Sequence, residues 1–283
     1  MMKHIEQIFA CFPAEIRQQI QSIASCNHGK LQEIRVYKDK EVHLFADNKH
    51  IQLRGRIKGD TITQILNNLM KYSYYAYEED IAKGFITIDG GHRVGICGKA
   101  VMNQGRVMML REVSSFNIRW AREVIGFSDS LMQHIITPEK INNVLIVSPP
   151  GCGKTTLLRD IARNLSQRDY KVAICDERSE IAGMHGGITN YQFGHMVDVL
   201  DGCPKAEGII MLIRSMSPDI IIADEIGRPE DLQAIETCVH AGVSVITSAH
   251  GYSIEDIHDQ YFDKLIFLTD SPHPGCLREV INV

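Results

Sequence analysis

The chain has 283 residues, which predicts two domains because a domain commonly holds about 100–150 residues. It is 44% hydrophobic and 23% charged, a composition that supports a folded core and excludes disordered and fibrous proteins. No apolar stretch reaches the roughly 18 residues of a membrane-spanning helix, and the first residues lack the pattern of a signal peptide. We therefore expect a cytoplasmic protein that is peripheral at a membrane only through partner proteins.

The formal net charge of −5 argues against a protein built chiefly to neutralise nucleic-acid phosphates. The charge is unevenly distributed, since residues 1–126 contain 18 basic and 13 acidic side chains, whereas residues 127–283 contain 12 basic and 22 acidic ones. We predict a boundary at Gly126 between a basic domain, 1–126, and an acidic domain, 127–283. The eight cysteines lie far apart and form no C-x-x-C pair, so reduced thiols without a zinc site are expected.

The N-terminal half has the pattern of an α+β domain. Apolar side chains at helical intervals cover residues 5–25 and are interrupted by Pro13, which predicts two helices. A further helical pattern covers residues 61–72. Short apolar runs bounded by polar or glycine-containing turns predict strands over 33–37, 41–46, 51–53, 84–88, 92–97 and 106–110.

The C-terminal half has the pattern of a doubly wound α/β domain. Short continuous apolar runs alternate there with helical patterns, as expected for a parallel sheet that is covered on both faces. The helical patterns include residues 155–165 and 229–241. The predicted strands are 144–147, 172–175, 220–223, 243–247 and 265–268.

The clearest chemical motif follows the first of these strands. It matches the phosphate-binding P-loop pattern, except that a serine replaces the first glycine, and it reads Ser148-Pro149-Pro150-Gly151-Cys152-Gly153-Lys154-Thr155-Thr156. The glycines let backbone N–H groups turn toward a phosphate, and the following helix adds its N-terminal N–H groups. We expect Lys154 to meet the β- and γ-phosphates of ATP and Thr155 to bind Mg²⁺. Cys152 is either a small residue that the loop tolerates or a thiol whose oxidation would place bulk beside the phosphates.

Two carboxylates end the strand at 220–223. Functional side chains of a parallel sheet gather at the C-terminal ends of its strands, where the P-loop also opens, so Asp224 and Glu225 are expected at the same ligand. Asp224 would hold Mg²⁺ through its water shell, and Glu225 would orient the attacking water. A kinase needs no such water-activating carboxylate, so the pair favours ATP hydrolysis.

Two further strands end in polar residues at the same edge. Asp176 and Glu177 follow the strand at 172–175 as a supporting acidic segment, and His250 follows the strand at 243–247. We expect His250 to sense the γ-phosphate through a hydrogen bond, as a third catalytic residue beside Lys154 and Glu225. A structural role for a histidine at a strand end is the alternative.

Together these motifs resemble those of the type II and type IV secretion ATPases and pilus motors, and most closely the sporulation branch of that family, the stage III sporulation AA proteins. Secretion ATPases usually have Gly-Glu where this chain has Asp224-Glu225, and this difference favours the sporulation branch. The resemblance covers almost the whole chain, through residues 91–98, 114–119, 148–156, 176–180, 213–219 and 224–225 and the segment ending at His250.

The resemblance implies a RecA-like C-terminal domain, a smaller N-terminal α+β domain and a hexameric ring beside membrane-embedded channel proteins. For the sporulation branch it also implies a place on the mother-cell side of the membrane. In such a ring an arginine of one subunit can reach the γ-phosphate held by its neighbour. The candidates for this role, each of which is otherwise a solvated or ion-paired side chain, are Arg93, Arg119 and Arg214, with Arg106 and Arg111 as further candidates.

The leading hypothesis is therefore a Mg²⁺-dependent ATPase that drives or gates assembly of a membrane channel complex during sporulation. The alternative is a RecA-like ATPase that acts on nucleic acid, a partner that we consider unlikely because no stacking platform or basic arm with aromatic residues is evident. A nucleotide kinase is a third hypothesis, which predicts phosphate transfer to a nucleoside or nucleotide and not to water.

Overall fold

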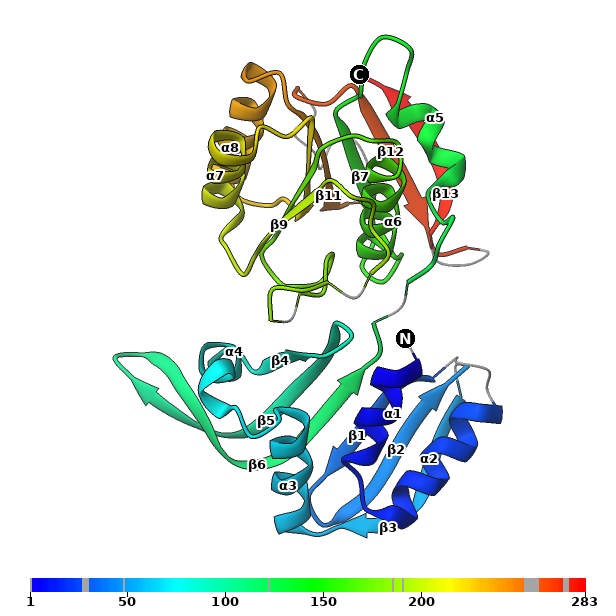
Figure 1. Cartoon of the computed structure of the whole chain (residues 1–283), viewed down its shortest axis with the longest axis vertical. Helices are drawn as coiled ribbons and strands as arrows, with labels where there is room; N and C mark the ends of the chain where they lie inside the picture. Colours follow the sequence, from blue (N-terminus) through cyan, green and yellow to red (C-terminus); the bar gives the residue numbers. More distant parts are fainter. Residues whose placement is uncertain are drawn as a thin grey trace. The chain divides into compact units, whose positions relative to one another are not determined.

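The chain forms two compact units, which are described separately (Figure 1). A computed structural model describes residues 2–26, 31–47, 49–121, 123–184, 186–189, 191–251, 260–271 and 275–283. The N-terminal unit comprises Met1–Ala121 and Gly183–Asn190, and the C-terminal unit comprises Arg122–Ala182 and Tyr191–Val283. Gly126, the predicted boundary between the basic and the acidic domain, therefore lies within the C-terminal unit. Within the described residues, no helix has the length and apolarity required to cross a membrane.

The N-terminal unit contains a six-stranded sheet in the order β3-β2-β1-β6-β5-β4, with every neighbouring pair antiparallel. Its elements are α1 (Met2–Ala10), α2 (Ala14–Cys26), β1 (Leu31–Tyr37), β2 (Lys40–Ala46), β3 (Lys49–Ile57), α3 (Gly59–Leu69), the 3-10 helix η1 (Tyr74–Tyr77), α4 (Glu78–Ala82), β4 (Phe85–Ile88), β5 (His92–Asn103) and β6 (Arg106–Arg119).

The α+β pattern predicted for this unit is confirmed. Proline has no backbone N–H for a helical hydrogen bond, and the chain turns between α1 and α2 around Pro13. Alternate strand residues face inward, as Ile34 and Val36 do on β1, and pack with apolar residues of α1, α2 and α3. The other face of the sheet carries the side chains in between, among them Arg35 and Tyr37.

Several element ends in this unit differ from the prediction, most clearly those of α3, β5 and β6. The helix expected over 61–72 ends at Leu69, because Lys71 and Tyr72 adopt positive φ angles of 51° and 59°, which a right-handed helix excludes. The last two strands are longer than expected, since β5 and β6 continue as a hairpin that extends beyond the sheet (Figure 1). The exposed and half-buried residues of this hairpin lack the simple alternation that marks a half-buried strand.

The C-terminal unit contains a seven-stranded sheet in the order β13-β12-β7-β11-β10-β8-β9. All neighbouring pairs are parallel except β12 and β13. Its elements are η2 (Asp129–Leu131), α5 (Met132–Ile135), β7 (Val144–Ser148), α6 (Lys154–Ser166), β8 (Val172–Asp176), β9 (Val197–Asp201), α7 (Lys205–Met216), β10 (Ile220–Glu225), α8 (Pro229–His240), β11 (Ser244–His250), β12 (Lys264–Thr269) and β13 (Cys276–Asn282).

This sheet is covered on both faces, as predicted. One face packs against α7 and α8 through alternate strand residues such as Ile221 and Ala223. Their neighbours Ile220 and Ile222 point to the opposite face, where α6 lies against four strands. The five strands expected from apolar runs are present, whereas the edge strands β9 and β13 were missed because their residues are only partly buried or exposed.

Helix α7 approaches β8 closely at Gly208. A Cβ atom at this position would lie 2.6 Å from the Sγ atom of Cys175 and 3.2 Å from Leu200. Both neighbours belong to the packed face of the sheet, so the backbone of α7 touches side chains of two strands. The absence of a side chain at Gly208 therefore fixes how close the first turns of α7 lie to the sheet.

We predict that Gly208→Ala lowers the free energy of unfolding by about 1–3 kcal/mol, because overpacking outweighs the better helix propensity of alanine. Gly227→Ala is the matched control, since a Cβ atom there would meet nothing within 4 Å. Chemical denaturation of both variants beside the parent chain measures the difference. Equal stability of Gly208→Ala and the control would show that α7 can move away from β8 at no cost.

Candidate nucleotide site

The loop between β7 and α6 has the backbone geometry of a phosphate cradle. Gly151 and Gly153 adopt positive φ angles of 82° and 81°, a region that only glycine enters readily. Gly153 is also the N-cap residue of α6, and no side chain caps the helix there. The first N–H groups of α6 are therefore left for another acceptor, and they carry the positive end of the helix dipole.

Lys154 is held by the loop that precedes it. Its Nζ atom donates to the backbone oxygen of Ser148 at 3.1 Å and lies 3.4 Å from the oxygen of Pro149. Burial lowers the pKa of Lys154, although the carboxylate of Glu225 acts in the opposite direction. The ammonium group is thus partly desolvated, and a charged phosphate oxygen would be a stronger acceptor than either of these two neutral carbonyls.

His250 connects Lys154 to Glu225. The Nδ1 atom of His250 lies 2.8 Å from Nζ of Lys154, and its Nε2 atom lies 2.8 Å from a carboxylate oxygen of Glu225. An ammonium group only donates hydrogen bonds, so Nδ1 must accept and the ring proton must be on Nε2. The structure therefore has a continuous series of contacts from Lys154 through His250 to Glu225.

Strand order explains this meeting of three distant residues. Strand β11 lies between β7 and β10, and its last residue, His250, is in register with Ser148 at the end of β7. On its other side, Ser248 of β11 is in register with Glu225 of β10. The predicted convergence of strand ends at one edge of the sheet is thus present for His250 and Glu225.

Asp224 has a partner that the sequence analysis missed. The Nζ atom of Lys205 lies 2.5 Å from a carboxylate oxygen of Asp224 and 2.9 Å from one of Glu177. Burial of the Lys205 ammonium disfavours its charge, but the hydrogen bonds and negative charges of Asp224 and Glu177 outweigh that effect and raise the pKa of Lys205. No motif contains Lys205, and only its position as the first residue of α7 brings it to this edge.

Asp176 and Glu177, which were predicted to act together, have different roles in the fold. Asp176 is fully buried, and its carboxylate accepts the backbone N–H groups of Glu180 and Ala182 at 2.9 and 2.8 Å. It therefore shapes the turn after β8, while Glu177 points to Lys205. Burial raises the pKa of Asp176 to about 6.

A second polar network connects α6 to the segment that precedes β7. Asp160 accepts hydrogen bonds from the N–H of Gly126 and from both the N–H and the hydroxyl of Ser128. Its other partner is Arg163, whose Nε atom lies 2.6 Å away. Despite burial, these contacts hold the pKa of Asp160 below its usual value. The segment before β7 is thus fastened to the helix that begins with Lys154.

The remaining predicted residues lie as follows. Cys152 is 1% exposed, which favours its reading as a small residue that the loop tolerates over that of a reactive thiol. Thr155 and Thr156 occupy the first turn of α6. Arg93 and Arg119 are cross-strand neighbours in the N-terminal unit, and the guanidinium of Arg93 lies 3.9 Å from the ring centroid of Phe85. Arg214 belongs to the last turn of α7 in the C-terminal unit.

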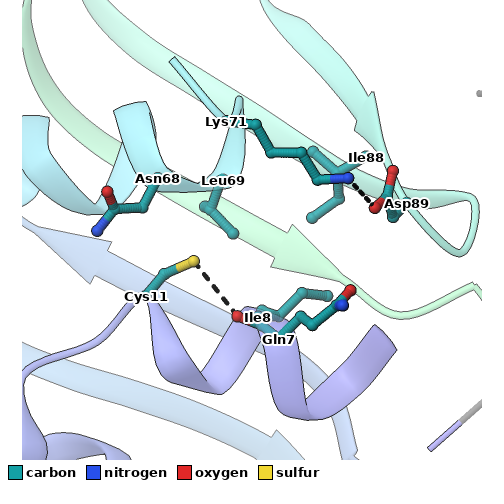
Figure 2. Close-up of a pocket in the computed structure, with 8 residues that line it drawn as sticks. All are labelled: Gln7, Ile8, Cys11, Asn68, Leu69, Lys71, Ile88 and Asp89. Atoms are coloured by element: carbon teal, nitrogen blue, oxygen red, sulfur yellow. Dashed lines mark hydrogen bonds and ion pairs between the residues drawn. The ribbon is translucent and has the colours of Figure 1, made fainter. Parts of the chain in front are cut away.

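A pocket in the N-terminal unit holds none of the predicted site residues. It lies beside α1, the end of α3 and β4, and the ion pair between Lys71 and Asp89 borders it (Figure 2). Its one thiol, Cys11, donates to the backbone oxygen of Gln7 at 3.4 Å, and burial raises its pKa. A thiol with a raised pKa is a poor nucleophile, so this pocket has no evident chemistry.

The residues at the edge of the C-terminal sheet suit a nucleotide with Mg²⁺. The uncapped N-terminus of α6 and the ammonium group of Lys154 provide donors for phosphate oxygens. Thr155 and Asp224 provide a hydroxyl and a carboxylate, the oxygen ligands that Mg²⁺ prefers. The present partner of Asp224 is Lys205, so the carboxylate already faces a cation.

The raised pKa of Asp176 predicts a pH dependence of stability. The folded chain holds this proton more tightly than the unfolded chain, so the free energy of unfolding falls as pH rises from about 4 to about 6. Asp176→Asn should remove up to about 3 kcal/mol of that fall, since one pKa unit corresponds to about 1.4 kcal/mol. Denaturation of both chains at several pH values measures the slope. Parallel stability curves would show that Asp176 does not titrate in this range.

Comparisons with known proteins identify the family and the fold of this chain. The family model described as sporulation stage III, protein AA, matches residues 2–281. The stage III sporulation protein AA of Bacillus subtilis is 40% identical, and the match covers 98% of this chain and 95% of that protein.

Two solved structures share the fold at 15% identity. The Legionella pneumophila ATPase DotB matches with a TM-score of 0.60 over 91% of this chain and 76% of that one. The pilus retraction motor PilT with bound ADP matches with a TM-score of 0.63 over 88% of this chain and 77% of that one. The chain thus shares its fold with the ATPase DotB and the pilus retraction motor PilT, and by its sequence it belongs to the stage III sporulation protein AA family.

Proposed function

We propose that this chain is a Mg²⁺-dependent ATPase that drives or gates the assembly of a membrane channel complex during sporulation. The observation that carries the proposal is the hydrogen-bonded chain of Lys154, His250 and Glu225 beside an uncapped helix N-terminus. The sporulation context comes from the Bacillus subtilis relative, and the motor role from the fold shared with DotB and PilT.

In the proposed mechanism each residue of the site has one task. The backbone N–H groups of residues 151–156, which follow the two prolines of the loop, and the ammonium of Lys154 bind the β- and γ-phosphates. The carboxylate of Glu225 orients the attacking water and accepts its proton. His250 holds Glu225 and Lys154 in one hydrogen-bonded line, so a change at the phosphate alters the position of the carboxylate.

Thr155 and Asp224 would hold Mg²⁺, which when bound neutralises charge on the phosphates. The exchange of hydrogen bonds on nucleotide binding involves only residues of the protein. Lys154 must exchange its bonds to the carbonyls of Ser148 and Pro149 for phosphate oxygens, which are stronger acceptors because they are charged. The cradle would thereby close on the nucleotide without a change in its glycine backbone.

We further propose that the working form is a hexameric ring, peripheral at a membrane through channel proteins and on the mother-cell side. The opposite charges of residues 1–126 and 127–283 support contacts between neighbouring copies. Arg93 and Arg119 share one face of the N-terminal sheet and remain candidates for a trans arginine, together with Arg214. If an arginine acts in trans, the hydrolysis rate per subunit rises with protein concentration as the ring assembles.

An ATPase acting on nucleic acid is the second candidate, and one observation favours it. The face of the N-terminal sheet opposite α1, α2 and α3 carries stacked rings. The ring centroid of His50 lies 4.9 Å from that of Phe45 and 5.0 Å from that of His43. The guanidinium of Arg35 lies 5.8 Å from the Phe45 ring. Aromatic and arginine side chains on a sheet can stack on bases. Stimulation of hydrolysis by single-stranded DNA, lost steeply with added salt, would support this candidate over the first.

Two substitutions separate binding from hydrolysis. Lys154→Ala should abolish nucleotide binding, because it removes the charge that meets the phosphates. Glu225→Gln should keep binding and lower the hydrolysis rate by roughly 10²–10⁴, the usual contribution of a general base. Fluorescent-nucleotide titration and phosphate release measure the two effects. ³¹P NMR of the products distinguishes hydrolysis from phosphate transfer to a nucleoside or nucleotide, and hydrolysis unchanged in Glu225→Gln would contradict the assignment.

His250→Asn tests the connection between the lysine and the carboxylate. The shorter amide cannot bridge both partners, so we expect nucleotide affinity within about tenfold of the parent and a hydrolysis rate lower by roughly 10². His240→Asn is the control, because His240 ends α8 and lies outside this chain of contacts. If both histidine variants hydrolyse ATP at the parent rate, His250 has only a structural role.

A further inference from the structure

The side chain of Lys205 is a cation buried between two carboxylates. It is 6% exposed, and its Nζ atom lies 2.5 Å from Asp224 and 2.9 Å from Glu177. Asp224 is near the end of β10, and Glu177 follows the end of the neighbouring strand β8. Two strand ends of one parallel sheet thus present their carboxylates to a single ammonium group.

Because the Lys205 side chain is buried, its two ion pairs differ in energy from ion pairs at the protein surface. A buried charge without a partner, such as the carboxylate of Asp224 would be, costs several kcal/mol, and the half-buried carboxylate of Glu177 nearby adds repulsion. A compact ammonium and a divalent metal ion both neutralise such a pair, and both prefer oxygen partners. Since Asp224 is also the expected carboxylate for Mg²⁺, the ammonium and the metal ion compete for it.

We propose that Lys205 is an internal counter-cation that neutralises Asp224 until Mg²⁺ and nucleotide bind, and then releases it while remaining paired with Glu177. This inference rests on the proposed nucleotide site and adds a residue that controls how that site is loaded. The flexible stem of lysine allows the exchange, because Nζ can leave Asp224 without leaving Glu177.

The position of Lys205 connects this exchange to a helix. Lys205 begins α7, and its backbone oxygen accepts a hydrogen bond from the Sγ atom of Cys175 in β8 at 3.7 Å. The close packing of Gly208 on the same cysteine holds the first turns of α7 against the sheet. The backbone of Lys205 is therefore fixed, and the exchange is confined to its side chain.

Lys205→Met is the direct test, with Mn²⁺ as the probe and no nucleotide present. Methionine keeps much of the side-chain volume but leaves Asp224 and Glu177 without a cation. We expect Mn²⁺ to bind this variant at least about tenfold more tightly than the parent, measured by the EPR signal of free Mn²⁺. Lys171→Met is the matched control, because Lys171 is an exposed lysine paired with Asp219 at 3.4 Å. Asp224→Asn added to Lys205→Met should abolish the gain.

Equal Mn²⁺ affinity of Lys205→Met, Lys171→Met and the parent chain would overturn the proposal, whatever the outcome of ATPase assays. Failure of Lys154→Ala and the parent to differ in nucleotide binding would instead refute the proposed function. If Lys205→Met does not fold, amine labelling of the parent chain followed by mass spectrometry gives the answer. Labelling of Lys205 should rise severalfold, relative to Lys171, when Mg²⁺ and a non-hydrolysable ATP analogue are added. Unchanged labelling would mean that Lys205 keeps its ion pair with Asp224, which would overturn the proposal.

Discussion

The position of β11 between β7 and β10 is the constraint on which the candidate site depends. Because the three strands are parallel, their C-terminal ends lie at one edge, and the middle strand must supply whatever connects the outer two. His250 ends that middle strand and has one ring nitrogen toward Lys154 and the other toward Glu225. A different strand order would separate the loop from the carboxylate and leave the histidine with one partner at most.

The sequence predicted the parts of this site that are tied to local patterns. The loop from Ser148 to Thr156 and the strand before Asp224 follow spacings that are visible in the sequence, so their places could be predicted without a structure. Lys205 could not be found, because its partners Glu177 and Asp224 are distant in the sequence and come together only through the pairing of β8 with β10. The two strands β5 and β6 were predicted, but their full length was not, because the mostly exposed residues beyond 92–97 and 106–110 do not alternate as those of a buried strand do.

The acidic character of the C-terminal unit is compatible with a site for a polyanion. Carboxylates near the proposed site have cationic or hydrogen-bonding partners within the unit, as Asp224 and Glu177 have in Lys205 and Glu225 has in His250. Local pairing of this kind shortens the range of each negative charge. An approaching phosphate would therefore meet Lys154 and backbone N–H groups first. The net charge of the C-terminal unit thus says little about which ligands this edge of the sheet can bind.

Arg159 connects α6 to the chain on both sides of residues 183–190. Its guanidinium donates to the backbone oxygens of Ile181 and Glu180 at 2.7 and 2.5 Å and lies 3.9 Å from the ring centroid of Tyr191. One side chain thus holds the chain where it leaves the C-terminal unit after Ala182 and where it returns at Tyr191. The helix that begins with Lys154 and both ends of the intervening segment therefore share one side chain, so the removal of Arg159 would loosen all three at once.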